Sequence, residues 1–155
     1  MADRTDIKTV TRSVHSDWKG DLRSEAHVRD CPPFFTDEPK GRGGLFEFPT
    51  PAEYIVSGLA GCSVAHVEMF AKEVGMPVED IHVDGRLTMG HFDPDDERSR
   101  AGGILGIELD IEVVSSGSPE ELEHVKALFR EKCVLYLFAK AAVPVVDEWT
   151  LVRPG

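Results

Sequence analysis

The chain has 155 residues, of which 41% are hydrophobic and 29% charged, as is usual for a soluble globular protein. At this length we expect one domain over residues 1–155. The net charge of −11 at pH 7 argues against nucleic acid or an anionic membrane as a partner. We find neither an apolar run of membrane-spanning length nor a secretory signal, and therefore expect a cytoplasmic protein.

The N-terminal third predicts strands and loops. Residues 7–18 are β-prone, residues 19–21 have turn chemistry, and residues 22–29 would form the second strand of a hairpin. Phe34 and Phe35 add a short strand. Residues 37–44 contain one proline and three glycines, so we expect a mobile loop there.

The segment from Thr50 to Val74 predicts a long helix with a well-defined start. Thr50 is a good N-cap, Pro51 suits the first helical position, and Glu53 completes a capping box. Apolar residues form two adjacent stripes, which predicts a mostly buried helix. The stripes are Ile55, Leu59, Cys62 and Met69, and Val56, Ala60, Val67, Phe70 and Val74.

Two glycines, Gly58 and Gly61, lie beside Cys62 on this helix. Each costs helix stability, roughly 1 kcal/mol relative to alanine. We therefore expect another helix or a substrate to pack closely against the helix at this point.

The remainder of the chain predicts two strands, two helices and a last strand. Residues 81–89 and 107–113 alternate in polarity, which favours an antiparallel pair of half-buried strands. Residues 91–103 read as an exposed polar loop. The capping pattern recurs at residues 118–121, before a predicted helix that reaches Cys133. A second helix is predicted at 134–142 and a last strand at 145–152. Helices and strands do not alternate regularly, so the predicted fold class is α+β.

Three cysteines, Cys31, Cys62 and Cys133, are too few and too far apart for a disulfide framework. No CxxC, HxH or HExxH motif is present, so a metal site could be assembled only through tertiary structure, and we expect neither metal nor cofactor. Cys62 and Cys133 have apolar neighbours. They are either buried thiols that pack as small hydrophobes or a redox pair with Cys133 close enough to resolve Cys62.

Other polar residues have simple structural explanations beside functional ones. Arg23, Arg29 and Arg42 would be solvated surface charges, and Cys31 an incidental cysteine before two prolines. His66 lies four residues after Cys62 and would either hydrogen-bond its thiol or serve as an interface histidine. The acidic run at residues 93–97 reads as a solvated loop without the spacing of an EF-hand.

Several motifs together resemble the OsmC/Ohr family of osmotically induced and organic hydroperoxide resistance proteins. PAEY at 51–54 is followed by LAGC at 59–62, which places the cysteine eleven residues after the proline. EKC at 131–133 matches a second cysteine at a helix start in the C-terminal third. WKG at 18–20 and GG at 43–44 fit as well, so the resemblance covers nearly the whole chain.

This resemblance implies an intertwined homodimer whose N-terminal strands wrap the partner subunit, and a thiol peroxidase without a cofactor. Cys62 would attack a hydroperoxide and become a sulfenic acid, Cys133 would close a disulfide, and an external thiol would reduce it. An arginine from the N-terminal region, held by a glutamate, would favour the thiolate. Arg23 and Glu53 are the candidates for these two roles. The apolar surroundings of both cysteines favour organic over inorganic peroxide.

The chain departs from the family pattern at two positions near these candidates. Ala52 occupies the place of the family's glutamate, and Glu53, one residue later, is rotated by about 100° around a helix. The arginine turn is Gly20-Asp21-Leu22-Arg23 instead of Gly-Gly-Arg, with Arg42 as a second candidate. The alternative hypothesis is therefore a non-catalytic OsmC-like dimer that binds an apolar ligand or partner, with structural cysteines.

Overall fold

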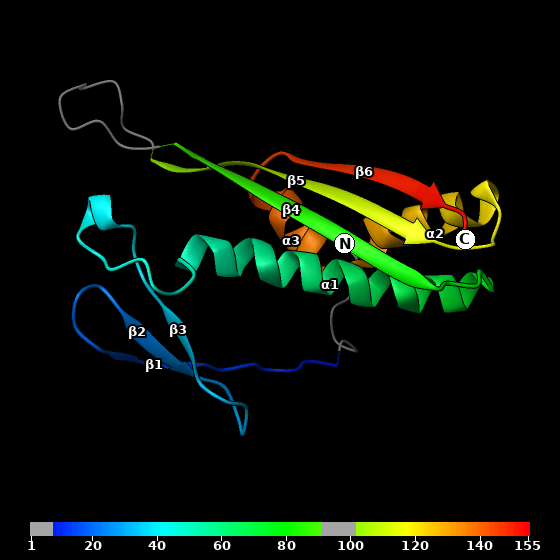
Figure 1. Cartoon of the computed structure of the whole chain (residues 1–155). Coiled ribbons are helices and arrows are strands. Elements are labelled where there is room, and N and C mark those ends of the chain that lie inside the picture. The colour runs from blue at the N-terminus through cyan, green and yellow to red at the C-terminus, as the bar shows by residue number, and fades with distance from the viewer. Residues whose placement is uncertain (1–7, 91–101) are drawn as a thin grey trace, which may run out of the picture. The chain divides into compact units, whose positions relative to one another are not determined.

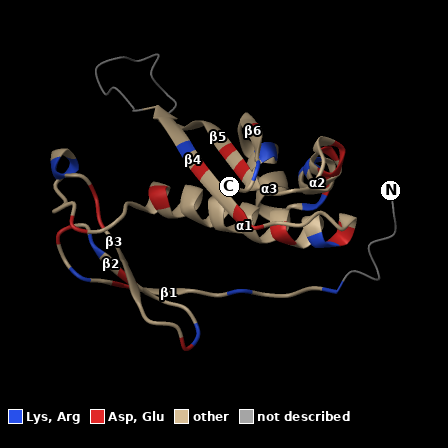
Figure 2. Ribbon diagram, turned by 45° about the vertical axis from the view of Figure 1, so that its right-hand side comes forward, with Lys and Arg blue, Asp and Glu red and all other residues tan. Residues whose placement is uncertain are grey.

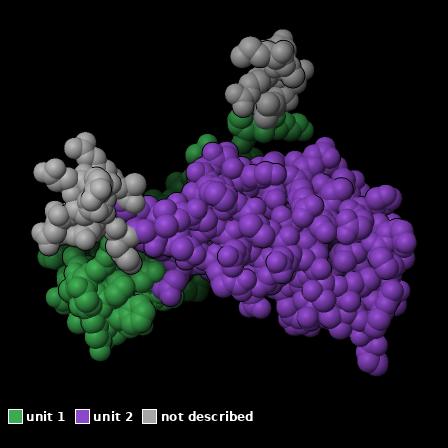
Figure 3. Space-filling model, turned by 90° about the horizontal axis from the view of Figure 1, so that it is seen from above, with its two compact units in different colours: residues 1–51 green, residues 52–155 purple. Residues whose placement is uncertain are grey.

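A computed structural model describes residues 8–90 and 102–155 of the chain, which divides into two compact units (Figure 3). The N-terminal unit comprises residues 1–51 and the C-terminal unit residues 52–155. The single domain expected from the length stays a prediction. The acidic run at residues 93–97 and most of the predicted loop at 91–103 lie outside the described residues.

The N-terminal unit contains a small antiparallel sheet in the order β1-β2-β3. Its elements are β1 (His15–Trp18), β2 (Ser24–His27), β3 (Phe34–Thr36) and the short 3-10 helix η1 (Lys40–Arg42). The predicted hairpin and short strand are confirmed, but the hairpin strands are shorter than predicted. Gly20, Asp21 and Leu22 all have positive φ (83°, 50° and 60°), so the turn extends into the segment assigned to the second strand.

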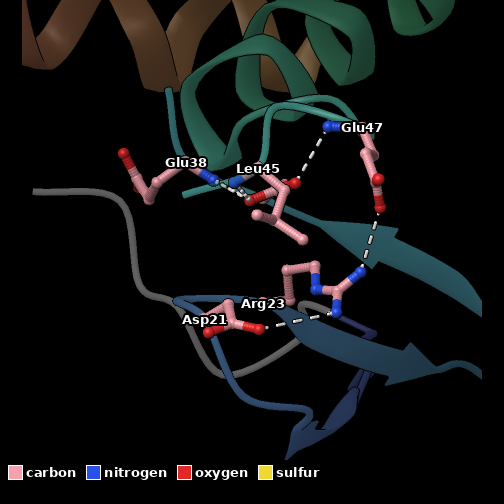
Figure 4. A network of polar contacts seen from close by, with 6 residues as sticks. Asp21, Arg23, Glu38, Leu45 and Glu47 are labelled. Atoms are coloured by element: carbon pink, nitrogen blue, oxygen red, sulfur yellow. Dashed lines mark hydrogen bonds and ion pairs between the residues drawn. The ribbon is translucent and has the colours of Figure 1, made fainter. Parts of the chain in front are cut away.

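A buried carboxylate, that of Asp37, organises the segment after β3. It accepts hydrogen bonds from the backbone N–H groups of Glu38 (2.7 Å), Leu45 (3.2 Å) and Glu47 (2.9 Å), in the network of Figure 4. Burial alone would raise the pKa of Asp37, but these backbone bonds outweigh it and hold that pKa below its usual value. A Cβ at Gly44 would lie 2.0 Å from the Glu38 carbonyl oxygen, so only glycine fits. The segment predicted as a mobile loop is thus anchored by hydrogen bonds.

The C-terminal unit is a three-stranded sheet with helices packed on one face (Figure 1). Its elements are α1 (Pro51–Val74), β4 (Asp80–Gly90), β5 (Gly103–Val114), α2 (Pro119–Lys132), α3 (Val134–Ala142) and β6 (Val145–Val152). β4 pairs antiparallel with β5, as predicted, and β6 pairs parallel with β5 on its other side. The predicted α+β class is confirmed.

Local sequence explains the boundaries of these elements. Ser118 Oγ accepts from the N–H of Glu121 (3.2 Å), and the N–H of Ser118 donates to the Glu121 carboxylate (2.7 Å). This is the capping box predicted for α2. On β5 four apolar side chains alternate with charged ones and are at most 3% exposed. They are Ile107, Leu109, Ile111 and Val113.

The opposite face of the sheet is charged and open to solvent. Acidic residues lie along β4 and β5 in Figure 2. Among them, Glu108 and Asp110 pair with Arg86 on the neighbouring strand at 2.9 and 2.7 Å. The helices therefore bury one face of the sheet only, as the alternating pattern requires.

One side of α1 contributes to the core, through Leu59, Ser63, Val67, Phe70 and Ala71. The other side is open: Ile55 is 50% exposed and Met69 53%. The prediction of a mostly buried helix is therefore wrong for the chain by itself, because the unit supplies a layer on one side of the helix only.

A Cβ atom built at Gly58 or at Gly61 would have no other described atom within 4 Å, apart from the neighbouring residues and the adjacent backbone of α1 itself. Within the described part of the C-terminal unit, nothing packs closely against these two glycines. By length and composition alone α1 could also cross a membrane. In the structure, however, five of its side chains are buried in the C-terminal unit, so α1 is a helix of the protein core.

Candidate active site

The structure brings together two cysteines that are 71 positions apart in the sequence. Cys62 Sγ and Cys133 Sγ lie 3.7 Å from each other, and both thiols are free. Cys62 lies in the middle of α1, and Cys133 at the junction of α2 and α3. Both residues belong to the C-terminal unit, so this pair is formed within one compact body.

Backbone hydrogen bonds on both sides hold Cys133 at the helix junction. Its N–H donates to the Phe129 carbonyl at the end of α2, and its own carbonyl accepts from the N–H of Leu137 in α3, both at 2.9 Å. Its side chain is completely buried. This burial, reinforced by the nearby Cys62 thiol, raises the pKa of Cys133 to about 11, although the backbone of Tyr136 acts in the opposite direction. At neutral pH Cys133 is therefore a thiol.

Cys62 is only partly buried and has an imidazole beside it. His66, one helical turn further along α1, places Nδ1 2.9 Å from the Cys62 carbonyl oxygen and 3.4 Å from Cys62 Sγ. A bare Nδ1 lone pair would face the carbonyl oxygen unfavourably. A proton on Nδ1 donates to the carbonyl and also points toward the sulfur. In this tautomer the Nδ1–H group of His66 lies 3.4 Å from the Cys62 sulfur as a possible donor.

A second buried carboxylate, Asp147 on β6, fixes the surroundings of Cys133. Its oxygens accept from the Tyr136 hydroxyl (2.9 Å), from Trp149 Nε1 (2.6 Å) and from the Arg130 guanidinium (2.9 Å). The network joins α2, α3 and β6 around the helix junction. Burial, followed by the bond to Asp147, raises the pKa of Tyr136 to about 12, so its hydroxyl stays a donor.

Our sequence analysis missed this network, although a signal for it was present. Asp147 lies in phase with Val145 and Trp149, two residues before and after it, on the strand face that packs against the core. A carboxylate at an inward-facing position of a strand requires hydrogen-bond donors.

We predict that Asp147→Ala lowers the free energy of unfolding by about 2 to 3 kcal/mol, because it leaves the hydroxyl of the buried Tyr136 and the indole N–H of the partly buried Trp149 without an acceptor. Urea unfolding followed by tryptophan fluorescence measures this change. Glu148→Ala, at the next, exposed position of β6, is the matched control and should change stability by less than about 0.5 kcal/mol. Equal losses in the two variants would contradict a role for the network.

Arg23 lies in the N-terminal unit, and its guanidinium faces carboxylates there. It pairs with Glu47 at 3.1 Å and with Asp21 at 3.9 Å (Figure 4). Its Nε is buried and has no hydrogen-bond partner in the part of the chain that the structure describes. Glu47 is thus a partner of Arg23 that sequence reasoning missed. The roles expected of Arg23 and Glu53 at Cys62 stay predictions, since Arg23 and Cys62 belong to different units.

The other candidates of the N-terminal unit have local partners. Arg42 pairs with Glu38 at 3.3 Å within the anchored segment. Arg29 donates to the sulfur of Cys31 at 3.7 Å, and that cysteine is exposed.

An apolar cavity of about 290 Å³ opens between α1, α3 and β5. Its lining includes Ile55, Leu59, Leu135 and Phe138. Leu59 precedes Cys62 by less than one helical turn, and Leu135 follows Cys133 by two residues. The cavity therefore adjoins the helix that carries Cys62 and the helix that begins directly after Cys133, and its lining suits a hydrocarbon group.

Comparisons with known proteins agree with this arrangement. The family model described as OsmC-like protein matches residues 42–146. A search of curated proteins finds no significant match. An OsmC-like protein from Mycoplasma pneumoniae superposes with a TM-score of 0.80 at 17% identity, covering 94% of this chain and 99% of that one.

Two solved structures of organic hydroperoxide resistance proteins also have similar folds. The one from Legionella pneumophila has a TM-score of 0.71 at 17% identity and covers 93% of this chain and 99% of its own. OhrB of Bacillus subtilis has a TM-score of 0.67 at 19% identity, with 91% and 98% covered. At these identities the likeness concerns the fold.

Proposed function

From the premise that this chain belongs to the OsmC-like protein family, we propose that it is a thiol-dependent peroxidase that reduces organic hydroperoxides. The observation that carries this proposal is the distance of 3.7 Å between Cys62 Sγ and Cys133 Sγ. A disulfide requires an S–S bond of about 2.05 Å, so a displacement of less than about 2 Å closes it.

The two cysteines differ in a way that assigns their roles. Cys62 is partly exposed and has the His66 donor beside its sulfur, whereas Cys133 is fully buried. A peroxide reaches Cys62 first. Cys62 is accordingly the peroxidatic residue and Cys133 the resolving one.

The reaction has two oxidative steps. The Cys62 thiolate attacks one peroxide oxygen, so that an S–O bond forms, the O–O bond breaks, and the alkoxide leaves as the alcohol after taking up a proton. The sulfur of Cys133 then attacks the Cys62 sulfenic acid, which forms the S–S bond and releases water. An external dithiol reduces the disulfide by thiol–disulfide exchange.

The apolar cavity supports an organic substrate. Its lining residues come mainly from α1, which carries Cys62, from α3, which begins directly after Cys133, and from β5. An alkyl or aryl group placed there would gain roughly 0.8 kcal/mol for each buried methylene, which hydrogen peroxide cannot gain.

The test is turnover of cumene hydroperoxide, tert-butyl hydroperoxide and hydrogen peroxide with dithiothreitol as reductant. The Cys31→Ser protein, which keeps only the thiol pair, should match the wild type and prefer the two organic substrates. One equivalent of cumene hydroperoxide without reductant should convert both thiols into a disulfide, visible by mass spectrometry. Absence of turnover with all three substrates would refute the proposal.

Arg23 is our candidate for the cation that favours the Cys62 thiolate. We predict that Arg23→Met lowers the rate of the first oxidation step by about 10- to 100-fold, while Arg23→Lys keeps more of it. Arg29→Met, at an exposed arginine of the same unit, is the control. Single-turnover kinetics measure the rate, and thermal unfolding separates a chemical effect from loss of the Glu47 ion pair. An unchanged first step in Arg23→Met would exclude this role.

A homodimer is the second part of the proposal. Its support is the uncovered apolar side of α1, which includes Ile55 and Met69, and the empty space around Gly58 and Gly61. Small residues let a second helix approach closely. Sedimentation velocity should give the mass of two chains.

A different class of function would follow from the same cavity. As a non-catalytic dimer, the protein would bind an apolar ligand next to two structural cysteines. Saturable binding of a fluorescent apolar probe, together with no peroxide reactivity at Cys62, would favour that alternative.

A further inference from the structure

The thiol pair and His66 together form a set of metal ligands that the spacing of the sequence does not reveal. One ligand atom from each of Cys62, His66 and Cys133 can be chosen so that all three lie within 4.8 Å of one another. Cys62 and His66 are one turn apart on α1, and Cys133 comes from the junction of α2 and α3. Two thiolates and an imidazole are ligands typical of zinc, with one position left for water.

Two of the three distances between the ligand atoms agree with tetrahedral coordination, and the third, from Cys133 Sγ to a ring nitrogen of His66, is at most 4.8 Å. With Zn–S of about 2.3 Å and Zn–N of about 2.05 Å, a tetrahedral angle requires about 3.8 Å between sulfurs and about 3.6 Å between sulfur and nitrogen. The structure has 3.7 Å between Cys62 Sγ and Cys133 Sγ, and 3.4 Å between Cys62 Sγ and His66 Nδ1. To bind an ion, Cys133 Sγ and the imidazole nitrogen have to approach each other by at most about 1.2 Å.

The chemistry of the donors selects the metal. The cluster contains no carboxylate, so it offers nothing to the hard ions Mg²⁺ and Ca²⁺, whereas soft thiolates with an imidazole suit Zn²⁺. Two thiolates also neutralise the charge of Zn²⁺, which removes the cost of burying a lone anion at Cys133. Cys62 and His66 are partly exposed and provide a route of entry.

We propose that the reduced protein binds one Zn²⁺ per chain through Cys62, His66 and Cys133. Binding through Nδ1 moves the imidazole proton to Nε2 and gives up the bond to the Cys62 carbonyl. That carbonyl keeps the backbone hydrogen bond of the helix.

Zinc and oxidation then exclude each other at this site. Bound thiolates are not free to attack a hydroperoxide, and a disulfide has no thiolates left to bind the ion. Once Zn²⁺ has dissociated, a hydroperoxide oxidises the two thiolates, which together give two electrons to the O–O bond. With two protons taken up, the products are the disulfide, one alcohol and one water, and the disulfide does not rebind the ion. This regulatory consequence rests on the proposed function, whereas zinc binding itself requires only the reduced thiols.

The binding test uses anaerobic, reduced protein in the Cys31→Ser background, so that the exposed third thiol contributes nothing. Competition with a chromogenic chelator should give one Zn²⁺ per chain. Co²⁺ in its place should show the thiolate charge-transfer band and the intense visible bands of a tetrahedral site.

The ligand variants and their controls decide the assignment. His66→Gln should weaken zinc binding by about 100-fold, and Cys133→Ala should do the same, since each removes one of three ligands. His124→Gln, at an exposed histidine of α2, should leave the affinity unchanged. Circular dichroism with thermal unfolding establishes that the variants are folded.

Three results would overturn the proposal: no stoichiometric zinc in the reduced protein, equal affinity in His66→Gln and His124→Gln, or undiminished binding after oxidation to the disulfide. Because no peroxide enters the binding experiment, its outcome is separate from that of the peroxidase assay. Zinc binding by a protein that shows no turnover in its zinc-free, reduced form would refute the enzyme and leave the metal site standing. Turnover without zinc binding would refute the metal site and leave the proposed enzyme standing.

Discussion

Cys62→Ser should abolish hydroperoxide consumption, with a rate at least about 1000-fold below the wild type and equal to that of the reductant alone. The serine hydroxyl is not ionised near pH 7 and does not attack an O–O bond. His66 would remain one turn away on α1 but would have no thiolate to stabilise. Cumene hydroperoxide consumption with dithiothreitol measures the loss.

Cys133→Ser should give a different result, because the first oxidation step does not require this residue. One equivalent of hydroperoxide should be consumed and Cys62 should stop as a sulfenic acid, trapped by dimedone and detected by mass spectrometry. Cys31→Ser is the control for a thiol outside the pair and should behave like the wild type. Equal rates in wild type, Cys62→Ser and Cys133→Ser would contradict the whole scheme.

Closure of the disulfide should accelerate about tenfold for each pH unit between about pH 7 and 10. The attacking group is the Cys133 thiolate, and burial raises the pKa of Cys133 to about 11. Below that pKa the thiol predominates, so each unit of pH increases the thiolate fraction tenfold. Single-turnover experiments that quench the reaction with acid and count disulfides measure the rate.

The matched control is the Cys133→Ser variant, in which dimedone traps the Cys62 sulfenic acid. The pH dependence of its formation reports on Cys62 alone, because the resolving thiol is missing. A flat profile for disulfide closure would mean that Cys133 is already ionised at neutral pH. The structural assignment of Cys133 as a buried thiol would then be wrong.

Patterns of local origin were predictable from the chain alone. The α2 capping box, the alternation on β5 and the last strand at residues 145–152 follow from hydrogen bonds and side-chain periodicity within a few residues. The length of the hairpin strands was predicted poorly, since three consecutive positive φ values at Gly20, Asp21 and Leu22 are not encoded in any simple turn pattern. Burial of α1 was overestimated because periodicity shows which side chains are apolar, and not how many layers cover them.

The features of the candidate active site also fall into those predictable from the sequence and those that only the structure shows. The sequence by itself determined the family resemblance, the cysteine on the central helix, and the second cysteine at a helix start, because these depend on motifs and spacing. Only the tertiary structure decided that the two sulfurs lie 3.7 Å apart, that Cys133 is buried, that His66 completes a ligand set, and that Asp147 holds the helix junction. These facts depend on contacts between segments up to 71 positions apart, where packing of helices on the sheet sets the distance and no local rule applies.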